Sequence, residues 1–201
     1  MKLFGMMGAM ETYKDLPVLF FENAEQWSAW LEQHHGEPAG VWLKFAKKDS
    51  GITSLNYAGA LDEALCYGWI DGQAKTIDET YYMQKFTPRR AKSIWSKRNV
   101  GKIADLTKAG RMKPSGIAAV EAAKQDGRWD QAYDGSSNIT VPPDFQAMLD
   151  SNPSAKEFYE SLNKTNTYAI LWRIQTAKKP ETRQARMEKL LAMLLEGKKL
   201  H

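Results

Sequence analysis

The sequence predicts an α+β fold, in which a small, mostly antiparallel sheet packed by helices is followed by a C-terminal all-helical module. Three observations predict it. Short runs rich in β-branched and aromatic residues recur before residue 90, helical periodicities lie between them, and only helical periodicities follow residue 139. Hydrophobic residues make up 43% of the 201 positions and charged residues 26%, which is typical of a chain that folds into a globular core.

The front of the chain opens with a strand and a helix. Residues 16–21 (LPVLFF) have the composition of a strand. Residues 22–35 place Trp27 and Trp30 at helical spacing behind Asn23, a residue type suited to the N-cap position. A strand followed by a helix is therefore the first expected unit.

A second strand is expected over residues 40–48 (GVWLKFAKK). Its alternation puts Val41 on one face and Trp42 and Lys44 on the other, and KDSG (48–51) supplies turn residues after it. One face of this strand is therefore apolar, and the other carries an aromatic and a basic side chain.

A helix and a hairpin follow. The helix fits from Asn56 to Gly68, since glycine accepts the left-handed conformation that commonly ends helices. Residues 70–78 and 79–88 are typical of two antiparallel strands joined by a turn. Two further helices are expected, over residues 100–110 and 114–127.

The rest of the chain divides from this front part near residue 138. Residues 127–138 lose periodicity and end in DGSSN, which is typical of a linker. We therefore expect a disordered extension (1–15), an α+β domain (16–138) and a helical module (139–201).

Charge and cysteine content restrict the class of protein. Residues 11–80 carry 12 acids and 5 bases, whereas residues 85–113 carry 10 bases and one acid, so separate electrostatic faces are expected. The single cysteine cannot form an internal disulfide, which indicates a reducing, cytoplasmic compartment. The three histidines lack metal-site spacing, so we expect no metal and no cofactor. No apolar stretch is long enough to predict stable membrane insertion.

Residues 61–72 (LDEALCYGWIDG) hold the candidates for catalysis. Cys66 is expected near the end of a helix and four residues after Asp62, where the helix dipole and the acid both disfavour a thiolate, so a structural role is favoured. Asp71, at a glycine-flanked corner, can bind local backbone or act with Asp62 or Glu63 as a general acid/base pair. No Cys/His or Ser/His/Asp arrangement can be assembled, which weighs against an enzyme.

Residues 85–99 (KFTPRRAKSIWSKRN) form the stronger candidate site. Arginine binds phosphate and carboxylate through paired hydrogen bonds, and aromatic rings among the bases stack on ligand rings. A groove for an anionic small molecule or nucleic acid is one interpretation, and a solvated charged surface is the other. The predicted ligand-binding residues are Trp42, Lys44, Asp71, Arg89, Arg90, Ser93, Trp95, Ser96 and Arg98.

Several stretches carry a family resemblance, namely GVWLKFAKKDSG (40–51), YAGALDEALCYGWIDGQ (57–73), YYMQKFTPRRAKSIWSKRN (81–99), AGRMKPSG (109–116) and DGRWDQAYD (126–134). With them the chain resembles the YdeI/OmpD-associated family, also called bacteriocin-protection proteins. The part from VPPDFQAML onward resembles the helical OmdA module. This resemblance implies a role in bacterial stress responses and antimicrobial-peptide or bacteriocin resistance, with a link to outer-membrane porins in some relatives. It implies no agreed reaction or catalytic residue.

Taken with the resemblance, the residues predict a cytoplasmic, non-catalytic protection protein that binds an anionic ligand or nucleic acid through a basic–aromatic groove. The alternative is an enzyme that uses Asp71 with Asp62 or Glu63 as acid and base on an anionic substrate. A protein partner that meets the C-terminal helices is a third interpretation.

Overall fold

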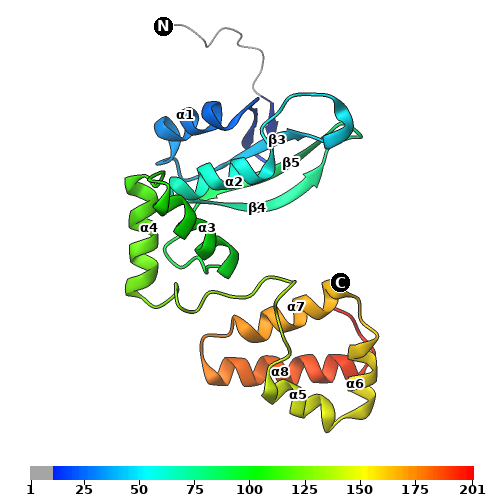
Figure 1. Cartoon of the computed structure of the whole chain (residues 1–201). Coiled ribbons are helices and arrows are strands. Elements are labelled where there is room, and N and C mark those ends of the chain that lie inside the picture. The colour runs from blue at the N-terminus through cyan, green and yellow to red at the C-terminus, as the bar shows by residue number, and fades with distance from the viewer. Residues whose placement is uncertain (1–10) are drawn as a thin grey trace, which may run out of the picture. The chain divides into compact units, whose positions relative to one another are not determined.

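The computed structural model describes residues 11–201 and confirms the α+β fold (Figure 1). Its five-stranded sheet has the order β1-β2-β3-β5-β4. Among these described strands, β2 and β3 are parallel neighbours, and the other neighbours are antiparallel. The strands are β1 (Thr12–Tyr13), β2 (Leu16–Phe20), β3 (Val41–Ala46), β4 (Trp69–Thr76) and β5 (Tyr81–Pro88).

The N-terminal extension expected over residues 1–15 falls partly outside the described residues, which begin at Glu11. From Glu11 onward the chain instead forms β1 and a tight turn into β2. In that turn Lys14 and Asp15 adopt the left-handed conformation, with φ of 50° and 62°, as the turns that join antiparallel strands require. This segment is held against the sheet because the Tyr13 ring packs edge-on against Trp42 of β3.

The strand register assigns side chains to two faces of the sheet. Trp42 lies opposite Lys85, and Lys44 lies opposite Met83. Directly opposed residues share a face, and neighbours along a strand alternate. We call the face that carries Trp42 the basic–aromatic face. On β3, β4 and β5, the side chains of this face are Trp42, Lys44, Lys75, Tyr81, Met83 and Lys85.

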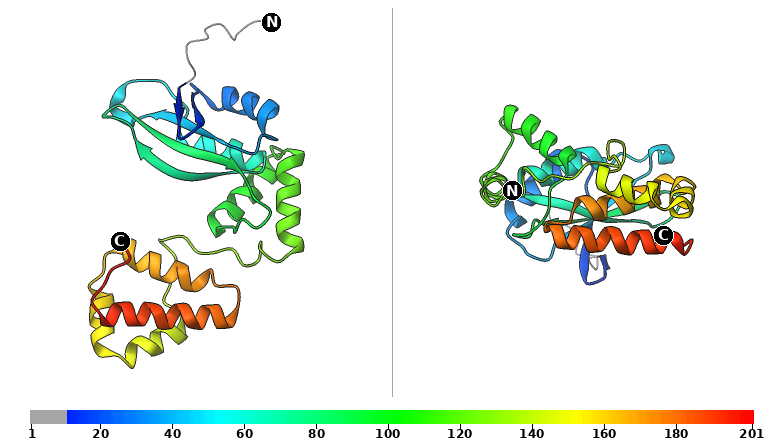
Figure 2. Two further views of the ribbon diagram at one scale, coloured as in Figure 1. Left: turned by 180° about the vertical axis from the view of Figure 1, so that it is seen from behind. Right: turned by 90° about the horizontal axis from the view of Figure 1, so that it is seen from below.

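Two helices cover the other face of the sheet, α1 (Ala24–His34) and α2 (Tyr57–Cys66) (Figures 1 and 2). Each begins at an asparagine, Asn23 or Asn56, whose side chain accepts a hydrogen bond from a first-turn N–H. Trp27 of α1 is fully buried, lies 5.9 Å from the Phe86 ring, and donates its indole N–H to the Ala60 carbonyl at 3.1 Å. The main core therefore lies between these helices and the sheet.

A short helix, η1 (Lys48–Ser50), follows β3, and two longer helices, α3 (Lys97–Lys108) and α4 (Pro114–Gln125), follow the sheet. The beginning of α4 packs against the end of α2. The Lys113 N–H donates to the Cys66 carbonyl at 3.0 Å, and the Ser115 hydroxyl donates to the Tyr67 carbonyl at 3.0 Å. The backbone carbonyls at the end of α2, which have no acceptor role within that helix, thus accept hydrogen bonds from the start of α4.

The chain divides into two compact units, one made of residues up to Ser93 with Asn99–Asp130, and one made of Ile94–Arg98 with Gln131–His201. The helices of the second unit are α5 (Pro143–Asp150), α6 (Pro153–Glu160), α7 (Lys164–Gln175) and α8 (Pro180–Leu195). Three of them begin with proline, which suits the first helical turn. Phe145, Leu149, Ile170 and Leu194 lie in their shared core. Within residues 11–201, no helix has the length and apolar character needed to cross a bilayer.

Candidate functional site

The three acids at the corner between α2 and β4 each have a hydrogen-bonding partner. The pairs are Tyr57–Asp71 at 2.8 Å, Lys102–Asp62 at 2.6 Å and Arg111–Glu63. The first pair joins α2 to β4, and the other two join α2 to α3 and to the segment after α3. These contacts favour structural roles for the three carboxylates, because each one holds two segments together.

Cys66 ends α2 and is buried, with 1% of its surface exposed. Burial raises the pKa of the Cys66 thiol to about 11, and the nearby Glu63 carboxylate acts in the same direction. The thiolate is the reactive form of cysteine. The thiol is therefore held in its unreactive state at neutral pH.

This raised pKa predicts a loss of stability in alkali. A thiol whose pKa is higher in the folded than in the unfolded chain stabilises the fold fully below pH 9.0, and this contribution disappears as the pH rises through 11. Between pH 8 and pH 11 we expect the unfolding free energy of the natural protein to fall by about 2 kcal/mol more than that of Cys66→Ala. Urea denaturation at both pH values measures this, and equal losses in the two proteins would contradict it.

The basic–aromatic face carries two lysines placed over tyrosine rings. The Lys44 Nζ lies 4.5 Å from the centre of the Tyr81 ring, and the Lys75 Nζ lies 4.0 Å from the centre of the Tyr13 ring. A hydrogen bond from Lys75 holds the pKa of Tyr13 below its ordinary value. Ammonium groups over aromatic faces are attracted by the ring quadrupole, so the rings hold both lysines on this face. The Glu11 carboxylate also pairs with the Lys44 Nζ, at 3.8 Å.

An exposed ring lies beside one of these pairs. Phe20, at the end of β2, is 42% exposed and meets Tyr81 edge-on at 6.4 Å. The register places Phe20 opposite Lys44. An ammonium group and an exposed aromatic ring are therefore neighbours on adjacent strands, which is the combination that binds a phosphate and stacks on a base.

A cavity of 370 Å³ opens where the β1–β2 turn lies over β3 and β4. Tyr13, Lys14, Trp42 and Lys75 are among the residues that line it. The indole of Trp42 is 3% exposed, and its buried N–H has no hydrogen-bond acceptor among residues 11–201. A buried donor without a partner costs about 1–3 kcal/mol.

Arg89, Arg90 and Ser93 share the loop that follows β5. The Arg89 N–H donates to the Gly68 carbonyl at 2.9 Å, and the Arg90 N–H donates to the Ser93 hydroxyl at 3.0 Å. The Ser93 carbonyl accepts from the buried Arg128 guanidinium at 2.8 Å. Backbone contacts thus fix the loop, and the Arg90 side chain is exposed.

Trp95, Ser96 and Arg98 belong to the second compact unit. The Trp95 side chain is 1% exposed, and its carbonyl accepts the Tyr133 N–H at 3.0 Å. Ser96 pairs with Tyr133 in a parallel bridge, while Arg98 is exposed. Trp95 therefore contributes to an interior rather than to an accessible surface.

The predicted ligand-binding residues thus fall into separate groups. Trp42 and Lys44 share the basic–aromatic face, whereas Asp71 lies opposite Phe86 and projects from the helix-covered face. Arg89 and Arg90 follow the sheet in their loop. Phe20, Tyr13, Lys75 and Tyr81, which also belong to this surface, are not among the residues predicted from the sequence. Tyr81 could have been predicted from the sequence, because Tyr81, Met83 and Lys85 alternate along β5 and therefore share one face.

Two family models match the chain. One, described as a domain of unknown function (DUF8412), matches residues 19–119, and the other, described as bacteriocin-protection, YdeI or OmpD-associated (OmdA), matches residues 138–197. The second match confirms the family resemblance on which the functional expectation depends. No curated protein and no solved structure matches the chain.

Proposed function

Because this chain belongs to the DUF8412 family and carries the OmdA module, described as bacteriocin-protection, YdeI or OmpD-associated, we propose that it protects bacterial cells by binding an anionic ligand. The description of the module points to bacteriocin protection as the biological setting. The proposed activity is non-catalytic. We assign it to the cytoplasm because a single cysteine offers no internal disulfide.

The observation that carries the proposal is the arrangement around Trp42 on the basic–aromatic face. On this face Lys44 and Lys75 lie over tyrosine rings, and Phe20 is exposed beside one of these pairs. Trp42, whose buried indole N–H has no acceptor among the described residues, lines the cavity at the adjoining turn. Cations and an exposed aromatic ring are therefore gathered on one surface.

This combination fits a ligand that carries both phosphates and flat rings. Ammonium groups neutralise phosphates, and exposed aromatic side chains stack on bases without regard to base identity. A β-sheet face with aromatic rings is also a common platform for single-stranded RNA. We therefore propose single-stranded nucleic acid, or its nucleotides, as the ligand class. Arg90, in the loop that follows β5, is a further exposed cation.

The test is a titration of fluorescently labelled single-stranded RNA and DNA at several salt concentrations. The variant Lys44→Gln/Lys75→Gln removes two cations from the face, and the control Lys164→Gln/Lys199→Gln removes two from the second unit. If both face lysines contact phosphates, the slope of log affinity against log salt falls by about 1.4 in the first variant. The control is expected to keep the slope of the natural protein.

A second variant separates base stacking from phosphate binding. Phe20→Ala is expected to weaken oligonucleotide binding by about 1–3 kcal/mol, the usual contribution of one stacked base, with no effect on the salt slope. Competition with mononucleotides shows whether one nucleotide is sufficient. Failure of the natural protein to bind any of these probes would contradict the proposal, as would equal slopes in both lysine variants.

A further inference from the structure

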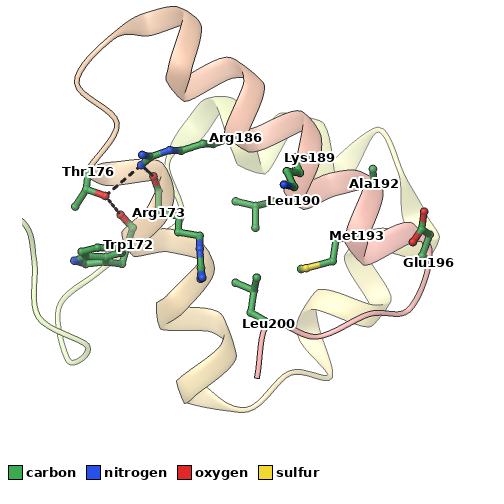
Figure 3. A pocket seen from close by; sticks show the side chains of 10 residues that line it. All are labelled: Trp172, Arg173, Thr176, Arg186, Lys189, Leu190, Ala192, Met193, Glu196 and Leu200. Atoms are coloured by element: carbon green, nitrogen blue, oxygen red, sulfur yellow. Dashed lines mark hydrogen bonds between the residues drawn. The ribbon is translucent and has the colours of Figure 1, made fainter. Parts of the chain in front are cut away.

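The second unit contains a pocket between α7 and α8 with a volume of 680 Å³ (Figure 3). Its apolar lining includes Leu190, Met193 and Leu200, whose side chains lie around the middle of the pocket in Figure 3. Leu200 is held there because the backbone N–H groups of the last two residues donate to the buried Asn166 side chain, at 3.1 and 3.0 Å. The C-terminal segment thus forms one wall of the pocket.

Three cationic side chains line the same pocket, namely Arg173, Arg186 and Lys189. Arg186 is fixed because it donates to the Arg173 carbonyl at 2.6 Å, at the end of α7. Arg173 makes one longer contact, to the Ala169 carbonyl at 3.3 Å. Among residues 11–201, no carboxylate forms a salt bridge with any of the three.

One acid also lines the pocket, Glu196 near the end of α8. Its side chain is exposed and its carboxylate points away from the middle of the pocket in Figure 3. The charge facing the apolar lining is therefore positive. A positive rim around an apolar interior is complementary to a molecule with an apolar body and one anionic end.

We propose that this pocket binds an amphipathic anion, an aliphatic chain that ends in a carboxylate or a phosphate. The chain lies against Leu190, Met193 and Leu200, and the anionic end meets Arg173 and Lys189. The volume is within the range of about 300–1,000 Å³ that is usual for small-molecule sites. Guanidinium groups bind both kinds of anionic end through paired hydrogen bonds. This site is independent of the basic–aromatic face, because every residue of it lies in the second unit.

Calorimetric titration of the full chain with hexanoate, octanoate and decanoate tests the proposal. We expect one site per chain, with affinity rising about 3- to 4-fold for each added CH₂ group. Octyl phosphate in place of octanoate identifies the preferred anionic end. Octanol and inorganic phosphate, which each lack one half of the ligand, are expected to bind at least 10-fold more weakly than octanoate or octyl phosphate.

The decisive variant is Arg173→Gln/Lys189→Gln, which is expected to weaken octanoate binding by about 10-fold or more, as for the loss of hydrogen bonds to a charged group. The control Lys164→Gln/Lys178→Gln removes the same charge from exposed positions outside the pocket lining and is expected to leave the affinity within 2-fold. If the double variant is unstable, the single variant Lys189→Glu replaces it, because Lys189 is exposed and the change is expected to weaken octanoate binding without disturbing the core. Octanol binding equal to that of octanoate, or no loss of affinity in the pocket variants, would overturn the proposal.

Discussion

Replacing Gly116 by alanine is expected to lower the free energy of unfolding by about 3 kcal/mol, among the largest effects of any single methyl group in this chain. Gly116 is buried in α4, where that helix crosses the end of α2. A Cβ atom at this position would overlap the Cys66 carbonyl oxygen, lie 2.8 Å from its carbon, and lie 3.0 Å from the Leu65 oxygen. These are backbone atoms, so they cannot move aside as a flexible side chain does.

The expected loss of stability in Gly116→Ala also includes weaker hydrogen bonds between α4 and the end of α2. Moving α4 away would stretch the hydrogen bonds from Lys113 to Cys66 and from Ser115 to Tyr67. Gly101→Ala is the matched control, because Gly101 lies exposed in α3 with no atom near its missing Cβ. That change is expected to stabilise the protein by about 0.5–1 kcal/mol, the usual gain of alanine over glycine in a helix. Urea denaturation of both variants measures the difference, and a loss below 1 kcal/mol for Gly116→Ala would refute the tight crossing.

Trp27→Ala is expected to cost about 3–5 kcal/mol, the usual range for truncating a fully buried tryptophan. Trp27 has no exposed surface and lies at the centre of an aromatic cluster. Its ring contacts are to Phe21 at 5.5 Å, Trp30 at 5.3 Å, Phe86 at 5.9 Å and Trp69 at 6.2 Å. The truncation leaves a cavity among these rings and also removes the donor to the Ala60 carbonyl.

Phe20→Ala is the matched control for Trp27→Ala, since it truncates a 42% exposed aromatic residue on the basic–aromatic face. Its effect on stability is expected to stay below about 1 kcal/mol. Thermal unfolding followed by circular dichroism compares the two variants. Similar losses of stability in both would mean that the core does not lie between the helices and the sheet.

The elements of the fold could be predicted where local chemistry decides them. Alternation along residues 40–48 marks the strand Val41–Ala46, because side chains on a strand alternate between two faces. The end of α2 could be predicted from Gly68, which adopts φ of 79° just after the helix, a conformation that other residues avoid. Proline at the first turn marks α5, α6 and α8 in the same way.

The composition of the candidate site could be predicted only in part, because it depends on contacts between distant segments. Lys75 meets Tyr13 only after β1 folds over the sheet, and the short β1 has too few residues for a periodic signal. Trp95 stands among basic residues in the sequence, yet its burial depends on pairing with the segment around Tyr133. The sequence shows the alternation that puts Trp42 and Val41 on opposite faces. It does not show which lysines and aromatic rings of other strands lie beside Trp42.

The most direct test of the proposed function is to locate the ligand on the chain. Single-stranded RNA that contains a photoreactive uridine is crosslinked to the full protein, and the modified residues are identified by mass spectrometry. The proposal predicts crosslinks to Phe20 or Tyr81 that disappear in Lys44→Gln/Lys75→Gln and persist in the Lys164→Gln/Lys199→Gln control. Crosslinks confined to residues 89–98 or to residues 139–201 would contradict the assignment of ligand binding to the basic–aromatic face.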